Sequence, residues 1–157
     1  MTTTAWQSGL QLRSLVTSAG ELQLSLERVE TPAPADGEVV VQVQASPINP
    51  SDLGLLFGPA DISTGRVGSN ANGPTFTADI PKHLMRMMAA RADESMPVGN
   101  EGCGVVVAAG ASPEAQALLG KTVACLGGAM YGQFRTLPLA SVMLLPDGTA
   151  PADGASC

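Results

Sequence analysis

The sequence predicts a mainly β domain with short helices, folded as a small and partly open β-barrel. Two observations lead to this prediction. The 157 residues include 18 glycines and 12 prolines, which separate short runs rich in Val and Leu. Hydrophobic residues make up 45% of the chain and charged residues 14%, which is enough apolar material for a packed core. At this length we expect a single domain.

Three strands are predicted near the N-terminus, at residues 10–16, 22–29 and 38–45. In the second run, Leu22, Leu24 and Leu26 alternate with polar residues, which is typical of a strand with one buried face. The third run begins with three consecutive valines, which favours a strand covered on both faces.

The next stretch is predicted to interrupt the strands. Turn and cap residues in Asn49-Pro-Ser-Asp52 predict one short helical turn at 53–57. Residues 59–80 are rich in Gly, Ser, Thr, Asn and Pro without a strong period, so we expect them to be the least structured part of the domain.

A helix is predicted at 81–93, because proline suits its first position and Leu84, Met85 and Met88 share one face. That methionine stripe fits core packing better than a ligand surface. Beyond it, strands are predicted at 104–109, 121–126, 130–137 and 142–145, with a short helix at 113–119.

Composition excludes several classes of function. The chain has a net charge of −6, one Trp, one Tyr and three Phe, which argues against nucleic-acid binding. No apolar stretch approaches the roughly 20 residues of a membrane span, and the N-terminus does not read as a secretion signal, so a cytoplasmic protein without membrane contact is expected.

The chemistry of the sequence is sparse. His83 is the only histidine, and the three cysteines show neither a disulfide framework nor metal-ligand spacing, so we expect no metal site and no Ser-His-Asp or Cys-His nucleophile. The glycines at 102, 104, 127 and 128 precede β-type sequence, whereas a phosphate-binding loop opens a helix. We therefore expect no complete nucleotide site.

Three stretches, in order, resemble the N-terminal GroES-like domain of the medium-chain dehydrogenase/reductase superfamily, most closely its zinc-independent quinone oxidoreductase branch. They are Val-Gln-Ala-Ser-Pro-Ile-Asn-Pro-Ser-Asp at 43–52, Pro-Val-Gly-Asn-Glu-Gly-Cys-Gly-Val-Val at 97–106, and Gly-Lys-Thr-Val-Ala at 120–124 with the run 130–138. The resemblance implies a GroES-like substrate-side domain over residues 1–157 with an insertion at about 59–95. It also implies a Rossmann cofactor domain that is absent from this chain.

The resemblance further implies an NADPH-dependent reductase that transfers a hydride directly to a quinone or an activated alkene. In zinc-using relatives a cysteine stands near Ile48 and a histidine at the position of Asn100, and neither is present here. Asn49 would approach the nicotinamide, Asp52 would hold the loop by capping backbone amides, and Asn100 would occupy the vacated metal position. For Tyr131, packing is favoured over substrate contact. No catalytic residue is identified.

Two alternatives stay open. Asn-Pro-x-Asp is good turn and cap sequence whatever its function. Tyrosines that some relatives carry near 53–56 or 58–60 are missing, so a proton would come from water, the insertion or the absent domain.

Alone, the chain is expected to be inactive and to bind NADPH weakly. The second reading of the whole chain is a non-catalytic GroES-like binding or oligomerisation module, with the Met85 to Met88 helix and the exposed C-terminal end as contact surface.

Overall fold

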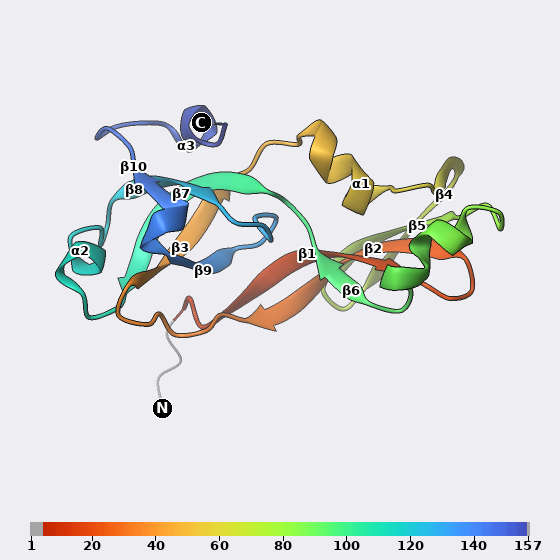
Figure 1. Cartoon of the computed structure of the whole chain (residues 1–157), viewed down its shortest axis with the longest axis horizontal. Coiled ribbons are helices and arrows are strands. Elements are labelled where there is room, and N and C mark those ends of the chain that lie inside the picture. The colour runs from red at the N-terminus through yellow and green to blue at the C-terminus, as the bar shows by residue number, and fades with distance from the viewer. Residues whose placement is uncertain (1–4, 157) are drawn as a thin grey trace.

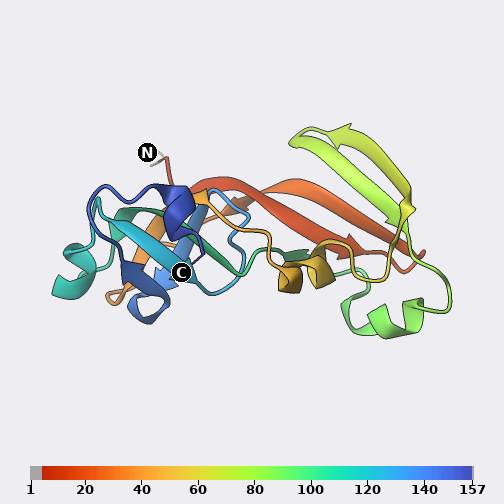
Figure 2. The ribbon, with the colours of Figure 1, turned by 90° about the horizontal axis from the view of Figure 1, so that it is seen from above.

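The computed structural model describes residues 5–156, which form two five-stranded antiparallel sheets (Figure 1). The first sheet has the strand order β4-β5-β2-β1-β6 and the second β10-β8-β7-β3-β9. They occupy opposite ends of an elongated molecule, and the second curls into a partly open barrel (Figures 1 and 2). The predicted fold class, mainly β with short helices, is confirmed.

The first sheet is built on a long hairpin. Strand β1 (Ser8–Val16) pairs along its whole length with β2 (Glu21–Glu30), and β6 (Ser95–Pro97) adds to the other edge of β1. Val16 and Leu22 lie opposite each other and are 1% exposed, so this end of the hairpin is a small core. Both predicted strands are confirmed.

The expectation that residues 59–80 are the least structured part is wrong. They form a second hairpin, β4 (Asp61–Asn70) and β5 (Gly73–Asp79), which extends the first sheet and rises from one end of the molecule (Figure 2). Strand β4 is an exposed edge strand, and a strand with no buried face needs no alternating hydrophobic residues. Arg66 ties it to the sheet through ion pairs of 2.6 Å to Glu21 and 2.9 Å to Asp79.

The helix predicted at 81–93 is shorter and of another type. Only η2 (Met85–Arg91) is helical, as a 3₁₀-helix, and Asp93 with a φ of 62° follows it. The predicted packing of the stripe is confirmed, because Leu84, Met85 and Met88 pack against the cluster of Val16, Leu22 and Ile80.

The second sheet carries the main core. Strand β3 (Glu38–Ala45) lies between β7 (Glu101–Ala109) and β9 (Phe134–Pro138), and β8 (Thr122–Leu126) and β10 (Val142–Leu144) complete the sheet. The three valines of β3 are 0% exposed, as the sequence predicts. The core residues are Val39, Val41, Val106, Ala115, Val123, Cys125, Met130 and Leu137.

Close backbone approach explains one glycine of β7. A Cβ at Gly104 would lie 2.0 Å from the carbonyl oxygen of Gln42, so only glycine lets β7 approach β3 at this point. The register of the two strands shifts nearby, between Val43 and Ala45. At this shift Gln44 of β3 is the extra residue, because Val43 and Ala45 pair with the consecutive residues Gly104 and Cys103.

Short helices and turns complete the fold. They are η1 (Pro50–Asp52), α1 (Leu53–Leu56), α2 (Pro113–Gln116), η3 (Leu139–Ser141) and α3 (Pro151–Gly154). The helical turn predicted at 53–57 is confirmed. The strand predicted at 130–137 begins only at Phe134, because the N–H groups of Met130, Tyr131 and Gln133 donate to the carbonyls of Gly99, Val98 and Leu10, outside the second sheet. Residues 127–129 before them all have positive φ. No helix within residues 5–156 is long and apolar enough to cross a membrane.

The turn before β9 joins the two sheets. The N–H of Leu12 in β1 donates to the carbonyl of Tyr131 over 2.7 Å, and the N–H of Gln133 donates to the carbonyl of Leu10 over 2.9 Å. These bonds place residues 131–133 between the first sheet and the barrel, where the motif segments also meet.

Candidate functional site

The loop that follows β3 carries the first motif. Its start is held by Ser46, whose hydroxyl donates to the Met130 carbonyl over 2.9 Å. Asn49 has an extended backbone and precedes η1, and its N–H donates to Oδ2 of Asp52 over 2.9 Å. Asp52 is only 1% exposed, so its carboxylate is a buried anchor for the loop. The Asp52 carboxylate thus accepts from one backbone amide of the loop, which is the kind of contact that the resemblance implies for this residue.

The second motif begins with a tight approach at Gly99. This residue has a φ of +94°, and a Cβ there would lie 2.6 Å from the Tyr131 ring. Both the conformation and the space require glycine. The carbonyl of Asn100 accepts from the N–H groups of Gly127 and Gly128, at 3.2 and 3.3 Å, which fixes the segment to the turn before β9.

Two side-chain hydrogen bonds join the first motif to the second. Nδ2 of Asn49 donates to Oε1 of Glu101 over 2.6 Å, and Nδ2 of Asn100 donates to the Ser51 hydroxyl over 3.0 Å. Asn49 is partly buried, whereas Asn100 and Ser51 are exposed. The structure thus brings both predicted asparagines to one surface.

Glu101 is a site residue that sequence reasoning missed. It lies next to Asn100 in the second motif, and a carboxylate at the start of a buried strand was the available signal. Its charge makes the bond to Asn49 a strong one, since hydrogen bonds to ionised groups are shorter and roughly twice as strong as neutral ones.

Tyr131 completes the site and does more than pack. Its hydroxyl hydrogen is shared between the Pro47 carbonyl, at 2.8 Å, and Oδ2 of Asp52, at 3.0 Å. Burial, the hydrogen bond to Asp52 and the negative charge of that residue raise the pKa of Tyr131 to about 12. The phenol is therefore protonated at neutral pH, and its proton is engaged within the protein.

Exposed apolar side chains flank Asn49. Ile48 is 72% exposed and Leu53 is 44% exposed, although both belong to an ordered loop and helix. The site thus presents the amide of Asn49 beside the exposed apolar side chain of the preceding residue, Ile48. Within the described part of the chain, no group of three or more His, Cys, Asp or Glu side chains gathers at a position that could hold a metal ion.

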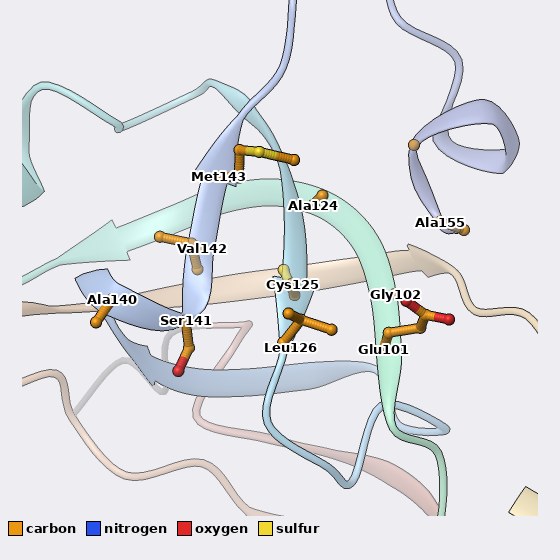
Figure 3. Close-up of a pocket in the computed structure, with 11 residues that line it drawn as sticks. Glu101, Gly102, Ala124, Cys125, Leu126, Ala140, Ser141, Val142, Met143 and Ala155 are labelled. Carbon is orange, nitrogen blue, oxygen red and sulfur yellow. The ribbon is translucent and has the colours of Figure 1, made fainter. Parts of the chain in front are cut away.

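Glu101 also lines an apolar pocket of about 120 Å³ (Figure 3). Met143 from β10 and Ala124 and Leu126 from β8 line it, and Ala155 closes it from the C-terminal segment. Cys125 also lines it, and burial, with a smaller effect of Cys103, raises the pKa of the Cys125 thiol to about 12. This cysteine is a thiol at neutral pH and a poor nucleophile.

Neither a protein-family model nor a curated protein sequence matches this chain. Solved structures do. A putative NADPH:quinone reductase from Mesorhizobium loti superposes with a TM-score of 0.61 at 24% identity, over 99% of this chain and 41% of that protein. The CurK enoyl reductase gives 0.61 at 19% identity, over 95% and 38%. A quinone oxidoreductase from Coxiella burnetii gives 0.58 at 11% identity, over 96% and 41%.

These likenesses concern the fold, and the chain spans about two fifths of the length of each of these proteins. The part that it matches is the N-terminal one. The chain therefore shares its fold with part of these reductases, and this mainly β fold is consistent with the GroES-like domain that its three ordered motifs predict.

Proposed function

We propose that this chain is the N-terminal, substrate-side part of a zinc-independent, NADPH-dependent reductase that transfers a hydride directly to a quinone or an activated alkene. The observation that supports this most is the joining of the two motif segments and Tyr131 into one surface that carries Asn49. A putative NADPH:quinone reductase and the CurK enoyl reductase share the fold. The proposal includes the cytoplasmic location expected from the sequence.

The residues present fit the nicotinamide end of the cofactor. A nicotinamide ring is a flat, weakly polar group with a carboxamide, and Asn49 beside exposed Ile48 offers an amide next to an apolar surface. When bound, NADPH would supply the hydride. The Asn49 side chain is itself neutral, and the charge beside it is that of Glu101, whose carboxylate accepts from the Asn49 amide over 2.6 Å.

The phosphate end would be held outside this surface. Gly102 and Gly104 lie inside β7, and Gly127 and Gly128 form the turn that leads to β9, so neither pair opens a helix as a phosphate-binding loop does. The predicted Rossmann domain, outside residues 1–157, would bind the phosphates. The isolated chain is accordingly expected to bind NADPH weakly and to be inactive.

The surface would position the reactants without supplying the proton. Tyr131 is the one tyrosine of the chain, and its hydroxyl hydrogen is directed at Pro47 and Asp52. We assign the proton that completes the reduction to water or to a group outside this surface.

The test is a measurement of NADPH oxidation by the polypeptide that the native reading frame encodes, with quinones and enoyl thioesters as acceptors. We expect turnover that depends on the acceptor, no turnover by residues 1–157 alone, and a loss of activity in Asn49→Ala. Fluorescence titration of NADPH measures binding separately. Unchanged NADPH in the presence of every acceptor would contradict the proposal.

A non-catalytic module is the second candidate, and exposed apolar side chains on β8 and β10 favour it. Leu126 and Met143 are 58% and 53% exposed and line the same pocket, and exposed apolar surface invites association. The methionine helix is a poorer contact surface than the sequence suggested, because Met85 and Met88 pack inward. This function predicts a homo-oligomer or partner complex that does not respond to NADPH, which light scattering with and without the cofactor distinguishes.

A further inference from the structure

Asn49 is held from two directions. Its side chain is bound by Glu101 from the second motif, and its backbone is bound by Asp52, which Tyr131 in turn holds from the turn before β9. The partners come from positions 52 and 79 residues further along the chain than the residues they hold. Glu101 therefore contacts the side chain of Asn49, whereas Asp52 contacts its backbone.

Glu101 determines which way the carboxamide points. The oxygen and nitrogen of an asparagine amide have nearly the same shape, so its orientation follows from its partners. A carboxylate only accepts hydrogen bonds, so the NH₂ group of Asn49 must face Glu101, here at 2.6 Å. A glutamine at 101 could accept or donate, and it would no longer select one orientation.

Tyr131 determines where the backbone of Asn49 lies. The Tyr131 hydroxyl and the Asn49 N–H donate to the same atom, Oδ2 of Asp52. Tyr131 is itself fixed, because its N–H donates to the Val98 carbonyl over 3.0 Å and its carbonyl accepts from Leu12. Loss of the hydroxyl would release the carboxylate that anchors Asn49.

We propose that Glu101 and Tyr131 are positioning residues for Asn49, with Glu101 selecting the orientation of its carboxamide and Tyr131, through Asp52, holding its backbone against the barrel. This inference rests on the proposed function, in which Asn49 faces the nicotinamide of NADPH. Neither residue needs to touch the cofactor.

The first test needs no activity. In ¹⁵N-labelled chain, the side-chain NH₂ signals of Asn49, identified by their loss in Asn49→Asp, report the bond to Glu101. We expect Glu101→Gln to shift them toward values of a solvent-exposed amide, whereas the matched surface variant Glu114→Gln leaves them unchanged. In Tyr131→Phe, exchange of the Asn49 N–H should be about tenfold faster while that of Val40 in β3 stays as it was. Signals and exchange equal to wild type would overturn the inference.

The second test uses the NADPH-oxidising polypeptide. Glu101→Gln should raise KM for NADPH about fivefold in the natural background, as expected when a charged hydrogen bond becomes a neutral one, and should change kcat less. In an Asn49→Ala background the same substitution should have no further effect. An equal rise in both backgrounds would show that Glu101 acts independently of Asn49, which refutes the inference.

The two tests separate the two proposals. Absence of NADPH oxidation in every variant, together with the expected changes in the Asn49 signals, would refute the proposed function. It would still establish that Glu101 and Tyr131 position Asn49. If NADPH is oxidised and the Asn49 signals of Glu101→Gln equal those of the wild type, only the inference is refuted and the proposed function stands.

Discussion

The Tyr131 hydroxyl and the Asp52 carboxylate lie 79 positions apart in the sequence and share a hydrogen bond of 3.0 Å. This bond connects the loop after β3 to the turn before β9, which also joins the barrel to the first sheet. Asp52 is buried, so its partners decide whether the charge is tolerated there. The candidate site and the junction of the two sheets are therefore stabilised by the same contact.

Removing the Tyr131 hydroxyl should lower stability measurably. Tyr131→Phe deletes the donor to Pro47 and Asp52, and a hydrogen bond to a charged group contributes about 1.5–3 kcal/mol of unfolding free energy, although Oδ2 of Asp52 keeps its bond from the Asn49 N–H. Urea unfolding measures the change. Thr136→Val is the matched control, since it deletes a partly exposed hydroxyl that donates to the Pro32 carbonyl, and it should cost less. If the two variants lose the same free energy of unfolding, burial of Asp52 does not increase the cost of removing its hydrogen-bond donor.

The pH dependence of stability should show the same contact. The pKa of Tyr131 is raised from 10 to about 12, so the unfolded chain releases this proton first. The protonated Tyr131 hydroxyl therefore contributes fully to the free energy of unfolding below pH 10. This contribution is lost as the pH rises from 10 toward 12, so the free energy of unfolding falls with pH in this window. Because the chain has one tyrosine, tyrosinate absorbance reports this group alone. Tyr131→Phe removes this component of the slope, and a tyrosine titrating near 10 in the folded protein would contradict the prediction.

Three glycine-to-alanine variants separate backbone strain from steric clash. Gly99→Ala introduces both, because φ is +94° and the new Cβ would lie 2.6 Å from the Tyr131 ring. Gly120→Ala introduces only strain at a φ of +73°, with no atom within 4 Å, and Gly37→Ala introduces neither. In thermal unfolding we expect no appreciable loss for Gly37→Ala, about 1–2 kcal/mol for Gly120→Ala and more for Gly99→Ala. A Gly99→Ala loss no larger than that of Gly120→Ala would show that the ring moves aside.

Cys125 should resist thiol reagents. Its side chain is 2% exposed and the pKa of its thiol is raised to about 12, so the thiolate is scarce at neutral pH. Incubation with iodoacetamide, followed by digestion and mass spectrometry, should find this cysteine unmodified in the native protein and modified in urea. Labelling of the native protein at a rate typical of a free thiol would show that the pocket beside β10 opens.

Local patterns were enough to predict most strands. The Val39 to Val41 run and the alternation from Leu22 to Leu26 each correspond to an observed strand, because burial in a sheet imposes a period of two residues or a continuous apolar run. Strand β4 was not predicted, because it lies at the edge of its sheet with nearly all its side chains exposed, so its sequence shows neither pattern. The helix at 81–93 was overextended because a shared apolar face does not distinguish a 3₁₀-helix of seven residues from an α-helix.

By itself the sequence determined the fold class, the barrel strands and the two motif segments, because turn residues and hydrophobic periodicity act over a few neighbouring positions. Only the tertiary structure decided that Glu101 orients Asn49 and that Tyr131 holds Asp52. These bonds depend on the direction of single side chains whose partners lie 52 and 79 positions away, and that direction is set by how the barrel closes onto the first sheet. No local period carries that information.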